Sequence, residues 1–198
     1  MRPNNTTIQI SEDRFVDFMN PDLSCIEIGD VVNGLATLQR WRGAGRSCSV
    51  LYHSVHVSDC AGQLARNNDM ISGHIACAAY WGLLHDAHEF LTGDLPTPLK
   101  RAIGGAWNNI EALLFIRLCE RFGIYDSVYA DSETWAVWQT ADRMVTHAEA
   151  IHYLGPTAST WATDPWDGWA PPSQSEWYTV DAFLQRYESL RARLGIEQ

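Results

Sequence analysis

Apolar residues recur three and four positions apart along most of the chain, and this spacing predicts helices rather than strands. The segment 74–90 is apolar on nearly every face until its C-terminal end, so we expect it at the centre of the fold. Residues 8–18 are compatible with a short strand or arm, but no alternation is sustained enough to predict a sheet. The predicted helices are residues 25–38, 50–66 with Ser49 as N-cap, 74–90, a short helix after Pro98, 106–123, 132–155, and 175–195 with Ser175 as N-cap.

These elements predict an all-α fold of six or seven helices in one domain. A chain of 198 residues suits a single domain that can bury a core. We expect the core to span about residues 25–155, followed by a Trp- and Pro-rich loop at 155–174 and then by the C-terminal helix. The loop carries Trp161, Trp166 and Trp169, and aromatic side chains this dense favour a loop that packs against the body.

Composition narrows the classes of function. The chain has 14 Lys and Arg against 24 Asp and Glu, and its formal charge of −10 argues against a binder of nucleic acid or anionic membranes. Five widely spaced cysteines without a C-x-x-C pair indicate scattered thiols in a reducing compartment. No apolar run reaches membrane-spanning length, and the first ten residues lack the apolar stretch of a signal peptide. We therefore expect a cytoplasmic protein, in the host cytoplasm if a phage encodes it.

The pair His85-Asp86 lies near the end of the predicted central helix, where a buried imidazole and carboxylate need partners. His53 lies on the preceding helix and Asp142 on a later one. Two imidazoles and two carboxylates suit a borderline transition ion, with positions left open for water or a phosphate oxygen. The alternative is that each residue is an ordinary polar group at a helix end. The complete set favours one divalent transition metal, with Co, Mn, Zn and Fe as candidates.

The order His53, His85-Asp86 and Asp142 resembles that of the HD-domain metal-dependent phosphohydrolases. The flanking segments are similar as well, in RWRGAGRSCSVLYHSVHVS, in WGLLHDAHEFLTGDLPTPLKRAI and in the shorter CERFG and TADRM. The similarity runs from about residue 13 to residue 150. Within the family it points to small bacterial and phage members, the HD-type 5′-deoxynucleotidases and the phage dATP triphosphohydrolases. The resemblance implies the all-α fold of these enzymes.

The resemblance assigns the four residues above to the metal and Glu89 to catalysis. On a continuous helix, Glu89 would project on the same side as Asp86, three residues before it. A carboxylate just outside the metal ligands can orient and deprotonate the attacking water. Asp94 matches a second acidic position, which is expected to assist protonation of water or of the leaving group. Its alternative is a turn or N-cap aspartate.

A protein of charge −10 that binds an anionic substrate needs local positive charge at its site. By the resemblance, Arg40 and Lys100 match residues that meet the substrate phosphate. Trp41 is expected to stack on the base or sugar, and its alternative is a packing residue. The basic residues that bracket the metal motif are Arg40, Arg42, Arg46, Lys100 and Arg101.

Two further histidines, His56 and His88, follow the two histidine ligands by three residues, a spacing that suggests a second metal. The resembling family carries apolar or small residues at both positions, so we predict that neither is a ligand. His88 is then a departure that alters the rim of the pocket. Glu149 returns to the helix face of Asp142 after seven residues, which makes it a candidate for supporting the ligands.

These features predict a metal-dependent phosphohydrolase of deoxynucleotides. Three arginines within residues 40–46 favour a polyphosphate, and the similarity to phage proteins points to dATP, cleaved to deoxynucleoside and triphosphate. The alternatives are a 5′-deoxynucleotidase that acts on monophosphates and a non-catalytic nucleotide-binding module, against which the intact ligand set argues. We expect a small nucleotide as substrate, no nucleic-acid or membrane partner, and self-association into a homo-oligomer.

Overall fold

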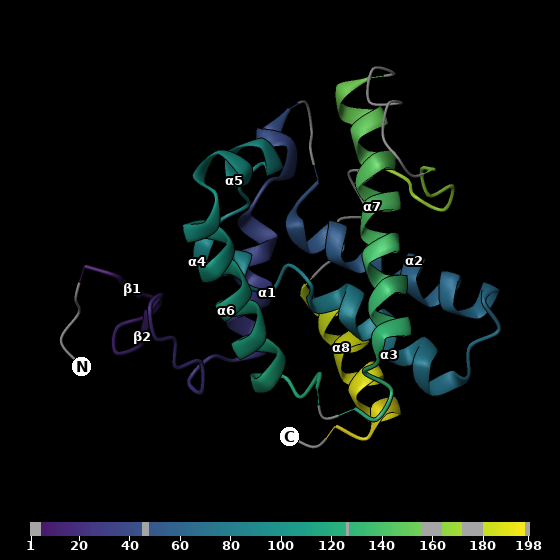
Figure 1. Cartoon of the computed structure of the whole chain (residues 1–198), viewed down its shortest axis with the longest axis horizontal. Helices are drawn as coiled ribbons and strands as arrows, with labels where there is room; N and C mark the ends of the chain where they lie inside the picture. Colours follow the sequence, from purple (N-terminus) through teal and green to yellow (C-terminus); the bar gives the residue numbers. More distant parts are fainter. Residues whose placement is uncertain (1–4, 45–47, 126, 156–163, 172–179, 197–198) are drawn as a thin grey trace.

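The computed structural model describes residues 5–44, 48–125, 127–155, 164–171 and 180–196. Within these residues the fold is almost entirely helical (Figure 1), which confirms the predicted all-α class. A short β-hairpin precedes the helices. The helical elements are α1 (Ile28–Thr37), the 3₁₀ turn η1 (Arg40–Gly43), α2 (Val50–Asn67), α3 (Ser72–Leu84), α4 (Glu89–Thr92), α5 (Thr97–Ile103), α6 (Gly105–Arg121), α7 (Ser132–Leu154) and α8 (Val180–Leu194).

Helices α2, α3 and α7 pack against one another and make up much of the right-hand half of the molecule in Figure 1. Every residue of α3 from Ala76 to Leu84 is buried, as expected for a segment that is apolar on nearly every face. Gly82 permits close approach to α2, because a Cβ at this position would lie 2.9 Å from the Val57 carbonyl oxygen. This packing brings the end of α3 next to the middle of α2 and of α7.

The helix ends follow local chemistry. Ser49 caps α2, since its side chain accepts a hydrogen bond of 3.1 Å from the Tyr52 amide. Two helices stop at glycines with left-handed backbone, α6 before Gly123 (φ +67°) and α7 at Gly155 (φ +88°). The predicted N-cap Ser175 lies outside the described residues.

The helix predicted over residues 74–90 is wrong in its last part. α3 ends at Leu84, and a turn over residues 85–88 leads into α4. In this turn the Glu89 amide donates a hydrogen bond to the Asp86 carbonyl at 2.9 Å. Apolar spacing reports which residues are buried, and it does not report where the helical hydrogen-bond ladder breaks. Asp86 and Glu89 are therefore brought together by a turn rather than by a continuous helix.

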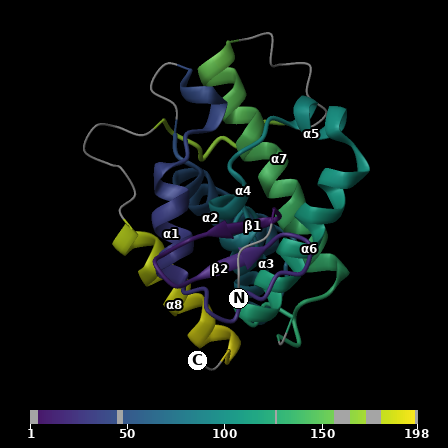
Figure 2. The ribbon, with the colours of Figure 1, turned by 90° about the vertical axis from the view of Figure 1, so that its left-hand side faces the viewer.

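Residues 8–18 fall largely within the β-hairpin, in front of the helices in Figure 2. Strand β1 (Thr7–Gln9) pairs antiparallel with β2 (Phe15–Asp17), and Ile8 lies opposite Val16. Arg14 in the connection forms an ion pair of 2.6 Å with Asp30 of α1. The sequence was compatible with either a short strand or an arm in this segment. Strands of three residues are too short to show the alternation of apolar and polar residues that would decide between them.

The described part of the Trp- and Pro-rich loop, residues 164–171, packs against α2 and α7. The Trp166 amide donates to the Met144 carbonyl at 3.1 Å, and its indole donates to Gln63 at 3.1 Å. The Tyr52 hydroxyl donates to the Ala170 carbonyl at 2.8 Å. Trp161, the third tryptophan named for this loop, lies outside the described residues.

All five cysteines are free thiols, and four of them are buried. None of the described helices combines the length and the apolar content that crossing a bilayer requires.

Candidate functional site

Four side chains from three helical segments converge at the centre of the molecule. His53 comes from α2, His85 and Asp86 follow the end of α3, and Asp142 comes from α7. His53 Nε2 lies 3.2 Å from Asp142 Oδ1, and His85 Nε2 lies 3.2 Å from Asp86 Oδ2. The crossed distances are 3.8 Å from His53 Nε2 to Asp86 and 3.7 Å from His85 Nε2 to Asp142. The structure thus brings together all four residues that the sequence suggested as metal ligands.

Both imidazole rings are turned so that Nε2 faces this centre. His53 Nδ1 is held by Glu149 Oε1 at 2.9 Å, and His85 Nδ1 is held by the Gly82 carbonyl at 2.8 Å. A metal-ligating histidine characteristically has its other nitrogen held in this way. His85 Nε2 is buried, and its contacts with Asp86 and Asp142 do not have the geometry of hydrogen bonds.

The donor atoms therefore fit a metal ion. One ligand atom each of His53, His85 and Asp142 lies within 4.8 Å of the others, whereas Asp86, the fourth predicted ligand, falls outside this group although its Oδ2 is 3.2 Å from His85 Nε2. Burial opposes ionisation of Asp86 and Asp142, but the neighbouring imidazoles outweigh it and lower the pKa of both carboxyls below the usual value. Two imidazole nitrogens beside ionised carboxylates make a possible metal site, and their mixed N and O chemistry suits a borderline divalent cation.

Glu149 is fully buried and links the metal-site residues to the 40–43 turn. Its Oε1 contacts His53, and its Oε2 accepts hydrogen bonds from Arg40 Nε at 2.8 Å and from the Trp41 indole at 3.1 Å. Burial would raise the pKa of Glu149, but Arg40 and His53 outweigh it and lower the pKa to about 2. An ionised Glu149 therefore fixes the orientation of His53 from behind.

Arg40 also reaches the other side of the site. Its guanidinium lies 3.7 Å from Asp86 and donates to the Thr146 hydroxyl at 3.2 Å. Thr146 in turn donates to Asp142 Oδ1 at 3.1 Å. Thr146 is not among the residues that the sequence suggested for the site. Its position four residues after Asp142 on the same helix could have identified it as a neighbour of that residue.

The turn that carries Arg40 has an unusual backbone. Trp41 and Arg42 have φ values of 56° and 54°, in the left-handed region, and Gly43 follows with φ 71°. For the two non-glycine residues, this conformation costs on the order of 1–3 kcal/mol each. The flanking residues hold the turn, since the Arg40 amide donates to the Cys48 carbonyl at 3.0 Å. The result is that Arg40 is buried while Arg42 is exposed.

Glu89, the predicted catalytic carboxylate, lies beside Asp86 and is only 2% exposed. Its Oε2 is buried without a hydrogen-bond partner among the described residues, and Lys100 Nζ lies 3.5 Å from Oε1. Burial, together with Asp86 and Asp94, raises the pKa of the Glu89 carboxyl well above its usual value. The raised pKa favours the protonated form of Glu89 relative to an exposed glutamate and makes its ionised form a stronger base.

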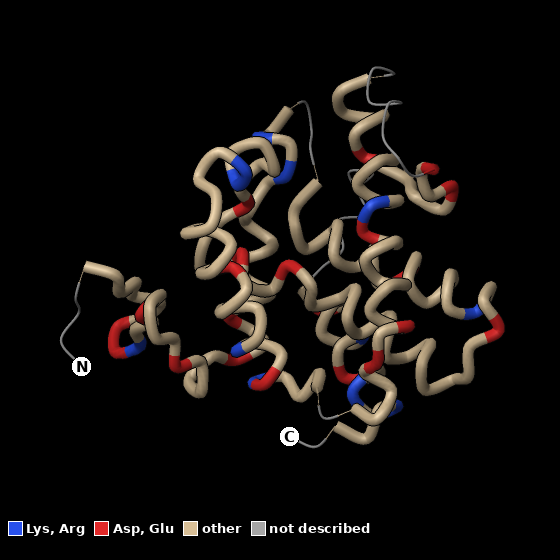
Figure 3. The backbone as a smooth tube through the Cα atoms, in the orientation of Figure 1, with Lys and Arg blue, Asp and Glu red and all other residues tan. Residues whose placement is uncertain are grey.

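A cavity of about 720 Å³ opens beside these residues, a size that suits a nucleotide. The predicted residues that line it are Arg40, Trp41, Arg42, Asp86, Glu89, Asp94, Lys100, Arg101 and Asp142. In Figure 3 the Lys and Arg residues of α5 and of the 40–43 turn lie at the same end of the molecule. Arg46 lies outside the described residues. The predicted catalytic and substrate-binding residues thus share one cavity with the metal-site carboxylates.

The two additional histidines, His56 and His88, contact residues outside the group of predicted metal ligands. The ring of His56 packs against Tyr52 and Trp166, at centroid distances of 4.5 and 5.7 Å, and burial lowers its pKa to about 4. His88 Nε2 contacts Glu111 at 3.2 Å. Neither belongs to the group of possible ligands found among the described residues.

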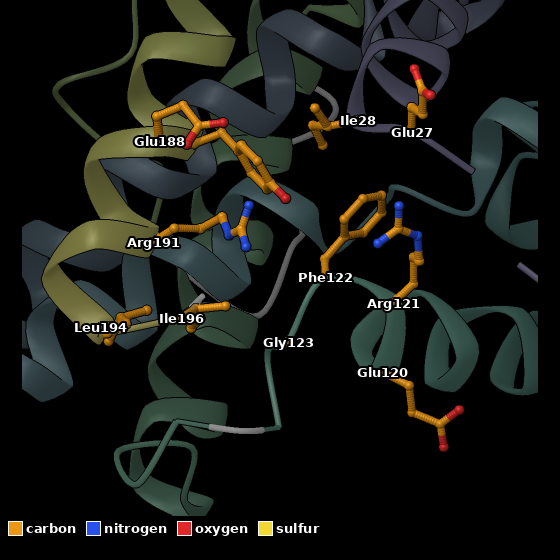
Figure 4. Close-up of a pocket in the computed structure, with 12 residues that line it drawn as sticks. Glu27, Ile28, Glu120, Arg121, Phe122, Gly123, Glu188, Arg191, Leu194 and Ile196 are labelled. Carbon is orange, nitrogen blue, oxygen red and sulfur yellow. The ribbon is translucent and has the colours of Figure 1, made fainter. Parts of the chain in front are cut away.

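A second cavity, of about 430 Å³, lies where α1, α6 and α8 meet (Figure 4). Arg121, Arg191 and Tyr187 line it together with three glutamates. No histidine or cysteine lines this cavity, and none of the residues predicted for the site does. The chemistry is therefore concentrated at the first cavity.

The Arg40–Glu149 pair leads to a stability prediction. Replacing Arg40 with alanine should lower the free energy of unfolding by about 3 kcal/mol, because it leaves a buried carboxylate without its strongest partner. Denaturant unfolding of the metal-free protein measures this change. Arg42→Ala is the matched control, since Arg42 is exposed on the same turn, and we expect a change within about 0.5 kcal/mol. Equal unfolding midpoints for the two variants would contradict the prediction.

Two known proteins are similar to this chain. An uncharacterized protein of Rhodobacter capsulatus is 37% identical over 114 residues, which cover 56% of this chain. The chain spans about half the length of that relative, 55%. A solved structure of the cyanophage S-2L HD phosphohydrolase DatZ, bound to dA and one catalytic Zn²⁺ ion, has 19% identity and a TM-score of 0.47. The match to it covers 87% of this chain and 86% of that one.

The sequence also matches the model of a known protein family. Residues 29–152 match the family described as 5′-deoxynucleotidase YfbR-like. This range is more than half of the chain, and it contains His53, His85, Asp86, Asp142 and the 40–43 turn. The chain therefore belongs to the YfbR-like 5′-deoxynucleotidase family, a family of HD-domain, metal-dependent phosphohydrolases.

Proposed function

We propose that this protein is a metal-dependent 5′-deoxynucleotidase, which hydrolyses deoxynucleoside 5′-monophosphates to deoxynucleosides and inorganic phosphate. The observation that carries the proposal is the convergence of two imidazoles and two carboxylates beside a cavity that also holds Glu89, Arg40 and Lys100. The family match adds the class of substrate.

In this proposal, His53, His85, Asp86 and Asp142 hold the cation. A bound divalent cation supplies Lewis-acid activation of water and of a phosphate oxygen. His53 is kept in position by Glu149, and His85 by the Gly82 carbonyl. Fixed rings of this kind set the metal geometry before substrate arrives.

The remaining residues act on the proton and on the charge of the phosphate. Glu89 accepts the proton of the attacking water, whose oxygen forms a bond to phosphorus as the bond from phosphorus to O5′ breaks. Arg40 and Lys100 neutralise the charge that develops on the phosphoryl oxygens. Asp94 also lines the cavity, and in this proposal it assists protonation of the departing O5′.

The preference for a triphosphate that the sequence suggested gives way here to the monophosphate alternative. That preference depended on three arginines in residues 40–46. Arg40 is engaged with Glu149 and Thr146, and Arg46 lies outside the described residues, so of these three arginines Arg42 is the exposed one that lines the cavity. The family match favours the same reading, and the non-catalytic alternative is disfavoured by the complete ligand and Glu89 set.

A substrate panel tests the proposal. Protein supplemented in turn with Co, Mn, Zn and Fe is incubated with nucleoside and deoxynucleoside mono- and triphosphates, and products are identified by mass. We expect the highest kcat/KM for deoxynucleoside monophosphates, with nucleoside and phosphate as products. Release of intact triphosphate from dATP as the preferred reaction would replace this function with the triphosphohydrolase. Nucleotide binding without turnover by metal-loaded protein would favour the binding module.

A further inference from the structure

We infer that Glu111 is a positioning residue, which holds Lys100 in the cavity with its ammonium beside Glu89. This inference deepens the proposed function and rests on it. Glu111 is not among the residues that the sequence suggested for the site, and its side chain does not line the cavity. Any effect on substrate must therefore pass through Lys100.

Lys100 has little support from its own helix. α5 is seven residues long, contains no buried residue and packs mainly against α6. Its apolar side chains Leu99 and Ile103 are 48% and 47% exposed. A lysine side chain has about 2 kcal/mol of rotamer entropy to lose when it is fixed in one position. A defined ammonium position in this cavity therefore needs a specific partner.

Glu111 supplies that partner from the neighbouring helix α6. Lys100 Nζ donates to Glu111 Oε1 at 2.5 Å and lies 3.5 Å from Glu89 Oε1. Gly104, with φ 76°, makes the sharp turn between α5 and α6 that allows this contact. Two carboxylates on different helices thus fix the ammonium between them.

The carboxylate of Glu111 is in turn held by a contact with the His88 ring. The His88 ring is 5% exposed, and its Nε2 lies 3.2 Å from the same Oε1 atom that binds Lys100. The hydrogen bond from His88, followed by the contact with Lys100, lowers the pKa of Glu111 to about 2. The carboxylate is therefore charged at neutral pH. His88 lies in the turn between the proposed metal ligand Asp86 and Glu89. Through Glu111, the position of Lys100 is therefore fixed relative to both of these residues.

The arrangement leaves Lys100 able to act on substrate. An ammonium has three N–H donors. One points to Glu111 and a second toward Glu89, which leaves one for a phosphate oxygen in the cavity that Lys100 lines. Without Glu111, we expect the flexible side chain to spread over several rotamers, and phosphate binding to weaken.

A double-mutant cycle tests this inference. Glu111→Gln is expected to raise KM for a deoxynucleoside monophosphate about tenfold, the loss typical of one charge-assisted hydrogen bond, with a smaller change in kcat. Lys100→Met should cost at least as much. In the Lys100→Met background, Glu111→Gln should add nothing further, because the two residues act as one unit. Glu120→Gln is the control, since it removes another α6 carboxylate whose partner Arg117 lies away from the cavity.

A binding measurement keeps the test independent of turnover. Calorimetric titration of inorganic phosphate into metal-loaded protein should show the same pattern, with affinity about tenfold lower in Glu111→Gln and Lys100→Met than in the wild type. If the wild type binds phosphate in this pattern but does not cleave monophosphates, the proposed function fails and the positioning role stands. Glu111→Asp, which keeps the charge but shortens the reach, serves as a second variant if Glu111→Gln does not fold. Unchanged KM and phosphate affinity in Glu111→Gln, fully additive losses in the double variant, or no phosphate binding by the wild type would overturn the inference.

Discussion

Replacing Glu89 with glutamine should lower turnover of deoxynucleoside monophosphates by about 10² to 10⁴-fold, the range for a positioned acid–base group. Glutamine has nearly the same shape but cannot accept a proton. The buried position of Glu89 and the raised pKa of its carboxyl support this role. Steady-state kinetics with equal metal loading measures the loss, which should fall mainly on kcat.

Two controls make the Glu89 result interpretable. Metal content and thermal stability should stay near wild type, because Glu89 is not one of the four converging residues. Glu133→Gln on exposed α7 surface should leave kcat unchanged. If Glu89→Gln turns over at a rate close to wild type, Glu89 is a bystander and another group accepts the proton.

Replacing His85 with alanine should abolish tight metal binding and, with it, turnover. Loss of Lewis-acid catalysis is worth several kcal/mol of activation free energy, which corresponds to roughly 10³-fold or more. Elemental analysis should find one divalent ion per wild-type chain and close to none in the variant. Phosphate release should fall in parallel.

The same prediction has a readout that does not depend on activity. A bound metal stabilises the folded state, so a chelator should lower the Tm of wild-type protein. The Tm of His85→Ala should respond to the chelator far less, whereas His74→Ala should behave like wild type. His74 lies in the first turn of α3, the helix that precedes His85, and pairs with Asp131, away from the site. One metal per chain in His85→Ala, with turnover retained, would contradict the assignment of the site.

Most helices could be predicted because their signals are local. The apolar spacing of α2, α6 and α7, together with Ser49 before the first of them and glycines after the other two, predicts boundaries close to those observed. The end of α3 could not be predicted, because residues 85–88 contain no glycine or proline and are buried or half-buried like the helix before them, while their backbone turns. Self-association stays a prediction.

The candidate site was predictable in its residue types and less so in its contacts. The order of His53, His85-Asp86 and Asp142 identifies the converging group, and the resemblance to the HD-domain phosphohydrolases assigns Glu89. Glu111 had no signal, because a glutamate on a helix facing solvent looks the same as one that holds a lysine.

The sequence by itself determined the helical class, the residues proposed to carry the chemistry and the resemblance to a family, since these depend on periodicity and on the order of side chains along the chain. Only the tertiary structure decided how these residues work together. His53 and Glu149 are 96 residues apart in the chain, and Arg40 and Glu149 are 109 apart. Whether such side chains touch depends on the packing of α2 against α7 and on a left-handed turn that places Arg40 inward and Arg42 outward. Packing of distant segments and the φ angles of a turn are properties of the folded chain, and no local pattern of residues encodes them separately.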